Sequence, residues 1–170
     1  MLTAAPGTLQ AALDTAARGW AVFPLRPGTK RPALHGETRC PRTGACSGGH
    51  VKWEERATTD PKRITRAWTQ APFNIGLATG PSGLVVIDLD MPKDGAAGPT
   101  GAEVFTALCK RAGQPFPDTF RAGTASGGQH LYFAAPNSHR LGNSAGLLGG
   151  LVDSRAWGGY VVAPGSMTSS

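Results

Sequence analysis

Glycine and proline interrupt this chain so often that long helices are excluded. Its 170 residues include 24 Gly and 14 Pro, which favour turns and loops. Short apolar runs of strand length lie between these breaks. Because a chain of this size builds one core comfortably and two with difficulty, we expect a single α+β domain over residues 1–170.

The apolar periodicity assigns most of the chain to short elements. Helices are expected from a Thr8 cap to Gly19, after the Asp60-Pro61 pair, and over 99–112. Strands are expected over residues 20–25, 74–78, 84–89, 119–122, 129–134, 150–153 and 159–163. The runs 74–78 and 84–89 are separated by a short turn, which predicts adjacent central strands in one sheet.

The segment 26–56 has neither period and carries two of the three cysteines. Within it, residues 35–56 are expected to form a loop or a small zinc-binding insertion, because loops of this length are usually functional. Four residues there have the side chains that tetrahedral zinc prefers, in the pattern H-x4-C-x5-C-x3-H: His35, Cys40, Cys46 and His50. Free thiols are the alternative. With Cys109 the cysteine count is odd, which argues against a disulfide framework.

Positive charge is concentrated in the first 70 residues. The net charge is +6, and 11 of the 17 Lys and Arg but only five of the 11 acidic residues precede Ala71. Such a charge excess attracts a polyanion such as DNA, although a charged surface also serves solubility.

Two carboxylates end the most apolar strand of the sequence, VVIDLD. Asp88 and Asp90 are two residues apart, so on a strand both point to the same face with Cα atoms about 7 Å apart. Oxygen ligands at this spacing could hold one or two Mg²⁺ or Mn²⁺ ions. A turn-forming strand end is the alternative.

Two later segments carry polar groups next to strands. The run SGGQHLYF places Ser126, Gly127 and Gly128 before a strand that contains His130, which is the outline of a phosphate-binding turn or of an ordinary hairpin. Asp153 ends another apolar run and could complete a metal site, with Arg155 available for a phosphate or for an ion pair with Asp153.

Together these segments resemble the bifunctional DNA primase/polymerase N-terminal domain, a family of the archaeo-eukaryotic primase superfamily. The resemblance covers about residues 8–168 and rests on motifs in the expected order: GTKRP (28–32), HG (35–36), TTDP (58–61), AW (67–68), NIGLATG (74–80), SGLVVIDLD (82–90), SGGQHLYF (126–133) and VDSRAWGGYVVAPGS (152–166).

The resemblance implies an RRM-like catalytic sheet with flanking helices and an N-terminal αβ unit. It implies template-dependent nucleotidyl transfer by a two-metal mechanism, with Asp88, Asp90 and Asp153 as metal ligands. Ser126, Gly127, Gly128 and His130 would bind the triphosphate of an NTP or dNTP, with Arg155 as a helper. Single-stranded DNA would be the template.

The family would continue with another strand after Ser170, so we expect a piece of a longer replication protein. The phosphate-binding motif of helicases and ATPases is absent from the sequence, so such an activity would lie in another domain or protein. There is no apolar run of membrane-spanning length and no secretory signal, which together predict a cytoplasmic protein without a membrane partner.

Three other interpretations remain open at this stage. A nucleotide-sugar glycosyltransferase also uses D-x-D at a strand end, but it leaves SGGQH and Asp153 without a role. A haloacid-dehalogenase-type phosphatase needs Thr or Val where this chain has Pro92. A non-catalytic DNA-binding module would use the basic first 70 residues alone.

Overall fold

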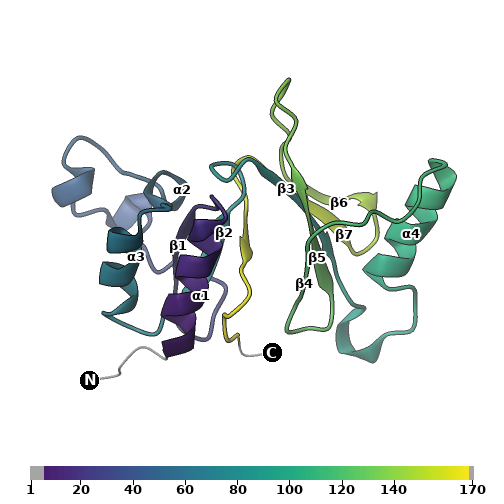
Figure 1. The fold of residues 1–170 in the computed structure, drawn as a ribbon, viewed down its shortest axis with the longest axis horizontal. Coiled ribbons are helices and arrows are strands. Elements are labelled where there is room, and N and C mark those ends of the chain that lie inside the picture. Colours follow the sequence, from purple (N-terminus) through teal and green to yellow (C-terminus); the bar gives the residue numbers. More distant parts are fainter. Residues whose placement is uncertain (1–5, 169–170) are drawn as a thin grey trace. The chain divides into compact units, whose positions relative to one another are not determined.

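The computed structural model describes residues 6–168 and forms two compact units, each with its own sheet (Figure 1). One unit runs up to Ser82 and resumes at Tyr160, and the other spans Gly83–Gly159. Helices accompany antiparallel strands in both, so the predicted α+β class is confirmed. The single domain over residues 1–170 stays a prediction. No helix among residues 6–168 has the length and apolar character needed to cross a bilayer.

The first unit has a three-stranded antiparallel sheet in the order β1-β2-β8, with helices α1 and α3 packed against β1. Its elements are α1 (Pro6–Ala17), β1 (Val22–Leu25), α3 (Pro61–Trp68), β2 (Asn74–Ala78) and β8 (Tyr160–Val162). Asp60 caps α3 by accepting a hydrogen bond from the Lys62 amide, and Pro61 takes the first helical position, as the sequence predicts. Ile64 and Trp68 are the buried side of this helix.

Between β1 and α3 the chain has little hydrophobic interior. This segment contains two 3₁₀ turns, Glu37–Arg39 and Gly44–Cys46, and the short helix α2 (Trp53–Arg56). Trp53 packs back onto the sheet, with its ring centroid 4.7 Å from that of Phe23 and 4.9 Å from that of Tyr160. Within residues 26–56, all of which the structure describes, Cys46 alone is buried.

The second unit has a five-stranded antiparallel sheet in the order β4-β5-β3-β7-β6. Its elements are β3 (Leu84–Leu89), a 3₁₀ turn (Lys93–Gly95), α4 (Gly101–Arg111), β4 (Arg121–Gly123), β5 (Gln129–Ala134), β6 (Ser144–Gly149) and β7 (Val152–Arg155). Strand β3 is central, so it has a partner on both sides.

Helix α4 covers one face of this second sheet. Leu89, Leu131 and Val152, from three adjacent strands, are buried together, and Val104 and Phe105 of α4 pack against them. The helix begins with a reciprocal cap between Thr100 and Glu103, whose carboxylate accepts from the Thr100 amide at 2.7 Å. This amide is the main reason why the pKa of Glu103 lies below its ordinary value.

One strand prediction was wrong, and one strand was missed. β2 and β3 are not neighbours but belong to different sheets. The turn between them does not form a hairpin, because β2 already pairs with β1 and β8, and the Ser82 hydroxyl bonds to the Ala21 amide and the Ala78 carbonyl instead. Strand β6, with Gly, Ser and exposed Leu, was not predicted, because its side chains do not alternate between buried and exposed.

Candidate active site

Strand pairing places three of the expected site residues side by side. In the register of the second sheet, Asp88 of β3 lies directly opposite His130 of β5 and directly opposite Asp153 of β7. Directly opposed residues of antiparallel strands point to the same face, with Cβ atoms about 4.5–5.5 Å apart. Leu89, the next residue of β3, packs under α4. Asp88, His130 and Asp153 therefore share the face of the sheet opposite to α4.

Asp88 is partly buried and under-satisfied. Its Oδ1 lies 3.4 Å from His130 Nε2, and this oxygen is buried without a hydrogen-bond partner among residues 6–168. Its side chain is 17% exposed and that of His130 is 10% exposed, so each keeps a small exposed surface. Tyr132, two residues beyond His130 on the same face, is buried. Burial first, and then the charge of Asp88, raises the pKa of its phenol well above the ordinary value.

Asp153 is held by neighbours of its own unit. One carboxylate oxygen accepts a hydrogen bond from the Gly146 amide at 2.8 Å, and the other lies 3.1 Å from the Arg155 guanidinium. The ion pair with Arg155 that the sequence left open is therefore formed. Each carboxylate oxygen has a second lone pair, so these contacts fix the orientation of Asp153 and leave acceptor capacity.

Asp90 follows the end of β3, and two glycines pack against its backbone. Its amide donates to the Leu151 carbonyl at 2.9 Å, and its carbonyl accepts from the Gly101 amide at 2.8 Å. A Cβ on Gly101 would come within 2.7 Å of the Asp90 nitrogen, and one on Gly128 within 3.4 Å of the Asp90 Cα. Neither position leaves room for a side chain. Because Gly128 belongs to the Gly-Gly turn, this turn lies next to Asp90.

The turn from Thr124 to Gly128 is closed by its own hydrogen bonds. The Gly127 amide donates to the Thr124 carbonyl at 3.0 Å, and the Thr124 amide donates to the Gly128 carbonyl at 2.9 Å. Gly127 has φ +86°, a conformation that favours glycine. The hydroxyls of Ser126 and Thr124 lie 3.1 Å apart, and Ser126 is exposed. Because the Gly127 amide donates to Thr124 inside the turn, it could donate to a phosphate only after this hydrogen bond breaks.

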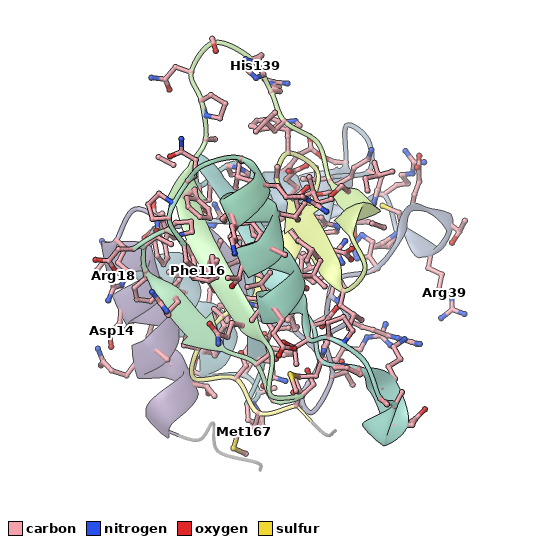
Figure 2. All side chains as sticks on the ribbon, turned by 90° about the vertical axis from the view of Figure 1, so that its right-hand side faces the viewer. Asp14, Arg18, Arg39, Phe116, His139 and Met167 are labelled. Atoms are coloured by element: carbon pink, nitrogen blue, oxygen red, sulfur yellow. The ribbon has the colours of Figure 1, made fainter. Side chains whose placement is uncertain are left out.

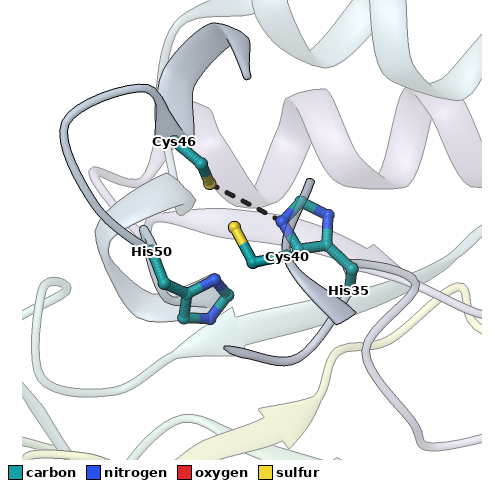
Figure 3. Close-up of side chains that lie close together, drawn as sticks. All are labelled: His35, Cys40, Cys46 and His50. Carbon is teal, nitrogen blue, oxygen red and sulfur yellow. Dashed lines mark hydrogen bonds between the residues drawn. The ribbon is translucent and has the colours of Figure 1, made fainter. Parts of the chain in front are cut away.

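The four expected zinc ligands also come together, in the first unit. One ligand atom from each of His35, Cys40, Cys46 and His50 lies within 4.8 Å of the others (Figure 3). Cys46 Sγ lies 3.6 Å from His35 Nε2. A His/Cys cluster able to hold a metal ion is therefore present in the insertion that the sequence predicts.

The family assignment rests on a sequence match over almost the whole chain. The model of the family "Bifunctional DNA primase/polymerase, N-terminal" matches residues 12–170. The chain belongs to this family. No curated protein matches it. Membership in the primase/polymerase family supports a role in nucleotidyl transfer with DNA and nucleotides as substrates, and it disfavours the glycosyltransferase and phosphatase interpretations.

Three residues next to the expected site were not singled out from the sequence. Tyr132 could have been found from its period-2 spacing to His130. Thr124 closes the glycine turn, and Gly101 supports Asp90 from the start of α4. The role of Thr124 arises from hydrogen bonds within its own turn, whereas that of Gly101 arises from a contact with a distant segment, which carries no local signal.

Proposed function

We propose that this chain catalyses template-directed nucleotidyl transfer, as a DNA primase or polymerase, at the face of the second sheet opposite to α4. Asp88, Asp90 and Asp153 would hold Mg²⁺ or Mn²⁺. His130 and the turn around Ser126 would bind the triphosphate of the incoming nucleotide. The expected place of action is a replication protein that copies single-stranded DNA.

The single observation that carries this proposal is the register of β3. It puts two carboxylates, Asp88 and Asp153, directly opposite each other at the centre of a sheet. Like charges in this position destabilise a sheet, and a buried carboxylate oxygen without a partner costs further free energy. A fold that needed only stability would not keep this pair, whereas a cation-binding site requires it.

The residues present fit a hard divalent cation. The donor set is made of carboxylate oxygens, which Mg²⁺ and Mn²⁺ prefer, and Asp88 Oδ1 is buried without a hydrogen bond among the described residues. When bound, such ions would activate the primer 3′ hydroxyl and neutralise the phosphates of the nucleotide. The fit of these carboxylates to Mg²⁺ or Mn²⁺ does not depend on a helicase partner or on bound zinc.

The chain's own residues would position the nucleotide. His130 Nε2 lies beside Asp88 on the face opposite to α4, where it could donate to a phosphate oxygen. The hydroxyl of Ser126 is exposed on the adjacent turn. Arg155 is oriented by Asp153 at 3.1 Å, so its remaining guanidinium donors could approach the same negative charge.

Replacing one carboxylate should abolish activity without unfolding the protein. Asp88→Asn, Asp90→Asn and Asp153→Asn should each lower nucleotide incorporation on primed and unprimed single-stranded templates by about 10³-fold, because the charge that holds the cations is lost. Asp88→Asn should keep or raise the melting temperature, since it removes repulsion from Asp153.

Asp118→Asn is the matched control, because this carboxylate lies in the same unit, is fully exposed and lies 3.9 Å from Arg121. It should retain wild-type activity. Incorporation above a tenth of wild type in Asp88→Asn would contradict the proposal. A wild-type protein that binds DNA without incorporating nucleotides would favour the non-catalytic DNA-binding module.

His130 should act mainly in nucleotide binding. His130→Gln removes one hydrogen bond to a charged phosphate, for which about 1.5–3 kcal/mol is typical, so KM for the nucleotide should rise about 10- to 100-fold while kcat falls much less. Steady-state kinetics at varied nucleotide concentration measures the two constants separately.

The control for this variant is His139→Gln, on the exposed loop that follows β5, where the His139 ring forms a hydrogen bond with the adjacent Ser138 (Figure 2). It should not change KM. A loss of kcat at unchanged KM in His130→Gln would show that His130 takes part in the chemical step instead.

A further inference from the structure

The segment 26–56 lacks the interior that would hold a fixed shape. Its two 3₁₀ turns and the four-residue helix α2 are too short to be stable by themselves. The one residue buried in it is a cysteine, Cys46, rather than a large apolar side chain. Ordering a polar chain of this length costs conformational entropy that this segment cannot recover by burying apolar surface. Some other interaction has to stabilise it.

The geometry of the four clustered side chains suits a tetrahedral ion. Zn–S bonds of about 2.3 Å and Zn–N bonds of about 2.0–2.1 Å place tetrahedral ligand atoms roughly 3.3–3.8 Å apart. Cys46 Sγ and His35 Nε2 are already 3.6 Å apart, and none of the four ligand atoms is more than 4.8 Å from another. Small side-chain rotations would bring all four ligand atoms to bonding distance from one ion (Figure 3).

Neighbouring hydrogen-bond donors hold the Cys46 sulfur in place. The Val51 amide donates to Cys46 Sγ at 3.4 Å, and the Arg56 guanidinium donates to the same sulfur at 3.0 Å. Outer contacts of this kind orient and tune metal ligands. His50 Nδ1 is buried without a hydrogen-bond partner in residues 6–168, which leaves a nitrogen for coordination.

We propose that His35, Cys40, Cys46 and His50 bind one structural Zn²⁺ ion that fixes the fold of residues 26–56. A Cys40–Cys46 disulfide is the competing use of these thiols. It would occupy two of the four residues and would give no role to the two imidazoles, whose ring centroids lie 5.5 Å apart. The zinc proposal is independent of the proposed catalysis, because no carboxylate of the second unit takes part.

The test is the metal content of the purified protein together with a cobalt spectrum. Wild type should hold about one equivalent of zinc after dialysis against a weak chelator. Its cobalt-substituted form should show the intense visible bands of tetrahedral thiolate coordination. Cys46→Ser should lose the metal, whereas Cys109→Ser, the third cysteine, should keep it.

If Cys46→Ser fails to fold, wild type still decides the question. Zinc removal by a strong chelator should then expose residues 26–56 to proteolysis and leave the second unit intact. Less than a tenth of an equivalent of zinc in protein made with added zinc, or an intact mass that shows a Cys40–Cys46 disulfide, would overturn the proposal. Nucleotide incorporation is not part of this readout, so its absence would not count against zinc.

A positively charged pocket lies beside this cluster. A pocket of about 340 Å³ in the first unit has three cationic side chains, two of the proposed zinc ligands and one aromatic ring in its wall: Arg26, Arg31, Lys52, His35, His50 and Trp53. No acidic residue lines it. The segment 26–56 carries seven Lys and Arg and three Glu, and Arg39 projects from it on the outside (Figure 2).

We infer that this pocket binds the phosphate backbone of a single nucleic-acid strand, which deepens the proposed function by naming a contact for its DNA template. Arg and Lys at phosphates supply sequence-independent affinity through counterion release. The positive charge extends beyond the pocket along the segment 26–56, which suits a strand better than a single free nucleotide.

Strand binding should therefore depend on these cations. Arg31→Gln/Lys52→Gln should weaken binding of a labelled single-stranded oligonucleotide about tenfold, and the dependence of log K on log salt should become shallower by about 1.4, the value for two lost phosphate contacts. Fluorescence anisotropy over a salt series measures both. The matched control is Lys62→Gln/Arg66→Gln, which removes the same charge from exposed positions of α3 and should change affinity less than twofold.

An equal loss in both double variants would show general charge attraction and overturn the pocket as a binding site. Displacement of the oligonucleotide by millimolar ATP in wild type would assign the pocket to nucleotide phosphates and would overturn the strand assignment. Measuring in the Asp88→Asn background separates this result from catalysis, since failure of the proposed nucleotidyl transfer leaves the binding data unaffected.

Discussion

The antiparallel register of β3 with its two neighbours is the constraint on which the candidate site depends. Asp88 lies opposite His130 on one side and Asp153 on the other, so three polar residues far apart in sequence share one face. Because a shift of one residue in either pairing would turn a side chain to the other face, the buried Leu89, Leu131 and Val152 under α4 fix the site as well as the core.

This arrangement places polar groups where a stable sheet would prefer apolar ones. Asp153 is compensated by Arg155 and the Gly146 amide, whereas Asp88 keeps a buried oxygen without a hydrogen bond among the described residues. Two glycines, Gly101 and Gly128, give the backbone of Asp90 the close packing that a side chain would prevent. These features trade stability for a charged, accessible surface, as functional sites commonly do.

The sequence predicts local elements well and long-range pairing poorly. Asp60 and Pro61 mark the start of α3, and the run 84–89 is the strand β3, because caps and apolar periodicity are local signals. The separation of β2 from β3 and the existence of β6 were missed, since they depend on which strands pair. The site residues were named from their motifs, but the opposition of Asp88 to Asp153 could be read only from the register. The convergence of His35, Cys40, Cys46 and His50 was anticipated from ligand type and spacing alone.

A crystal of the protein grown with Mn²⁺ and a non-hydrolysable nucleoside triphosphate would show whether the proposed carboxylates hold divalent cations. Anomalous scattering at the manganese edge should show density in contact with carboxylate oxygens of both Asp88 and Asp153, with the triphosphate beside His130. Manganese bound only at other carboxylates, such as Asp118, with the face that carries Asp88 and Asp153 free of metal, would contradict a catalytic metal site at these residues.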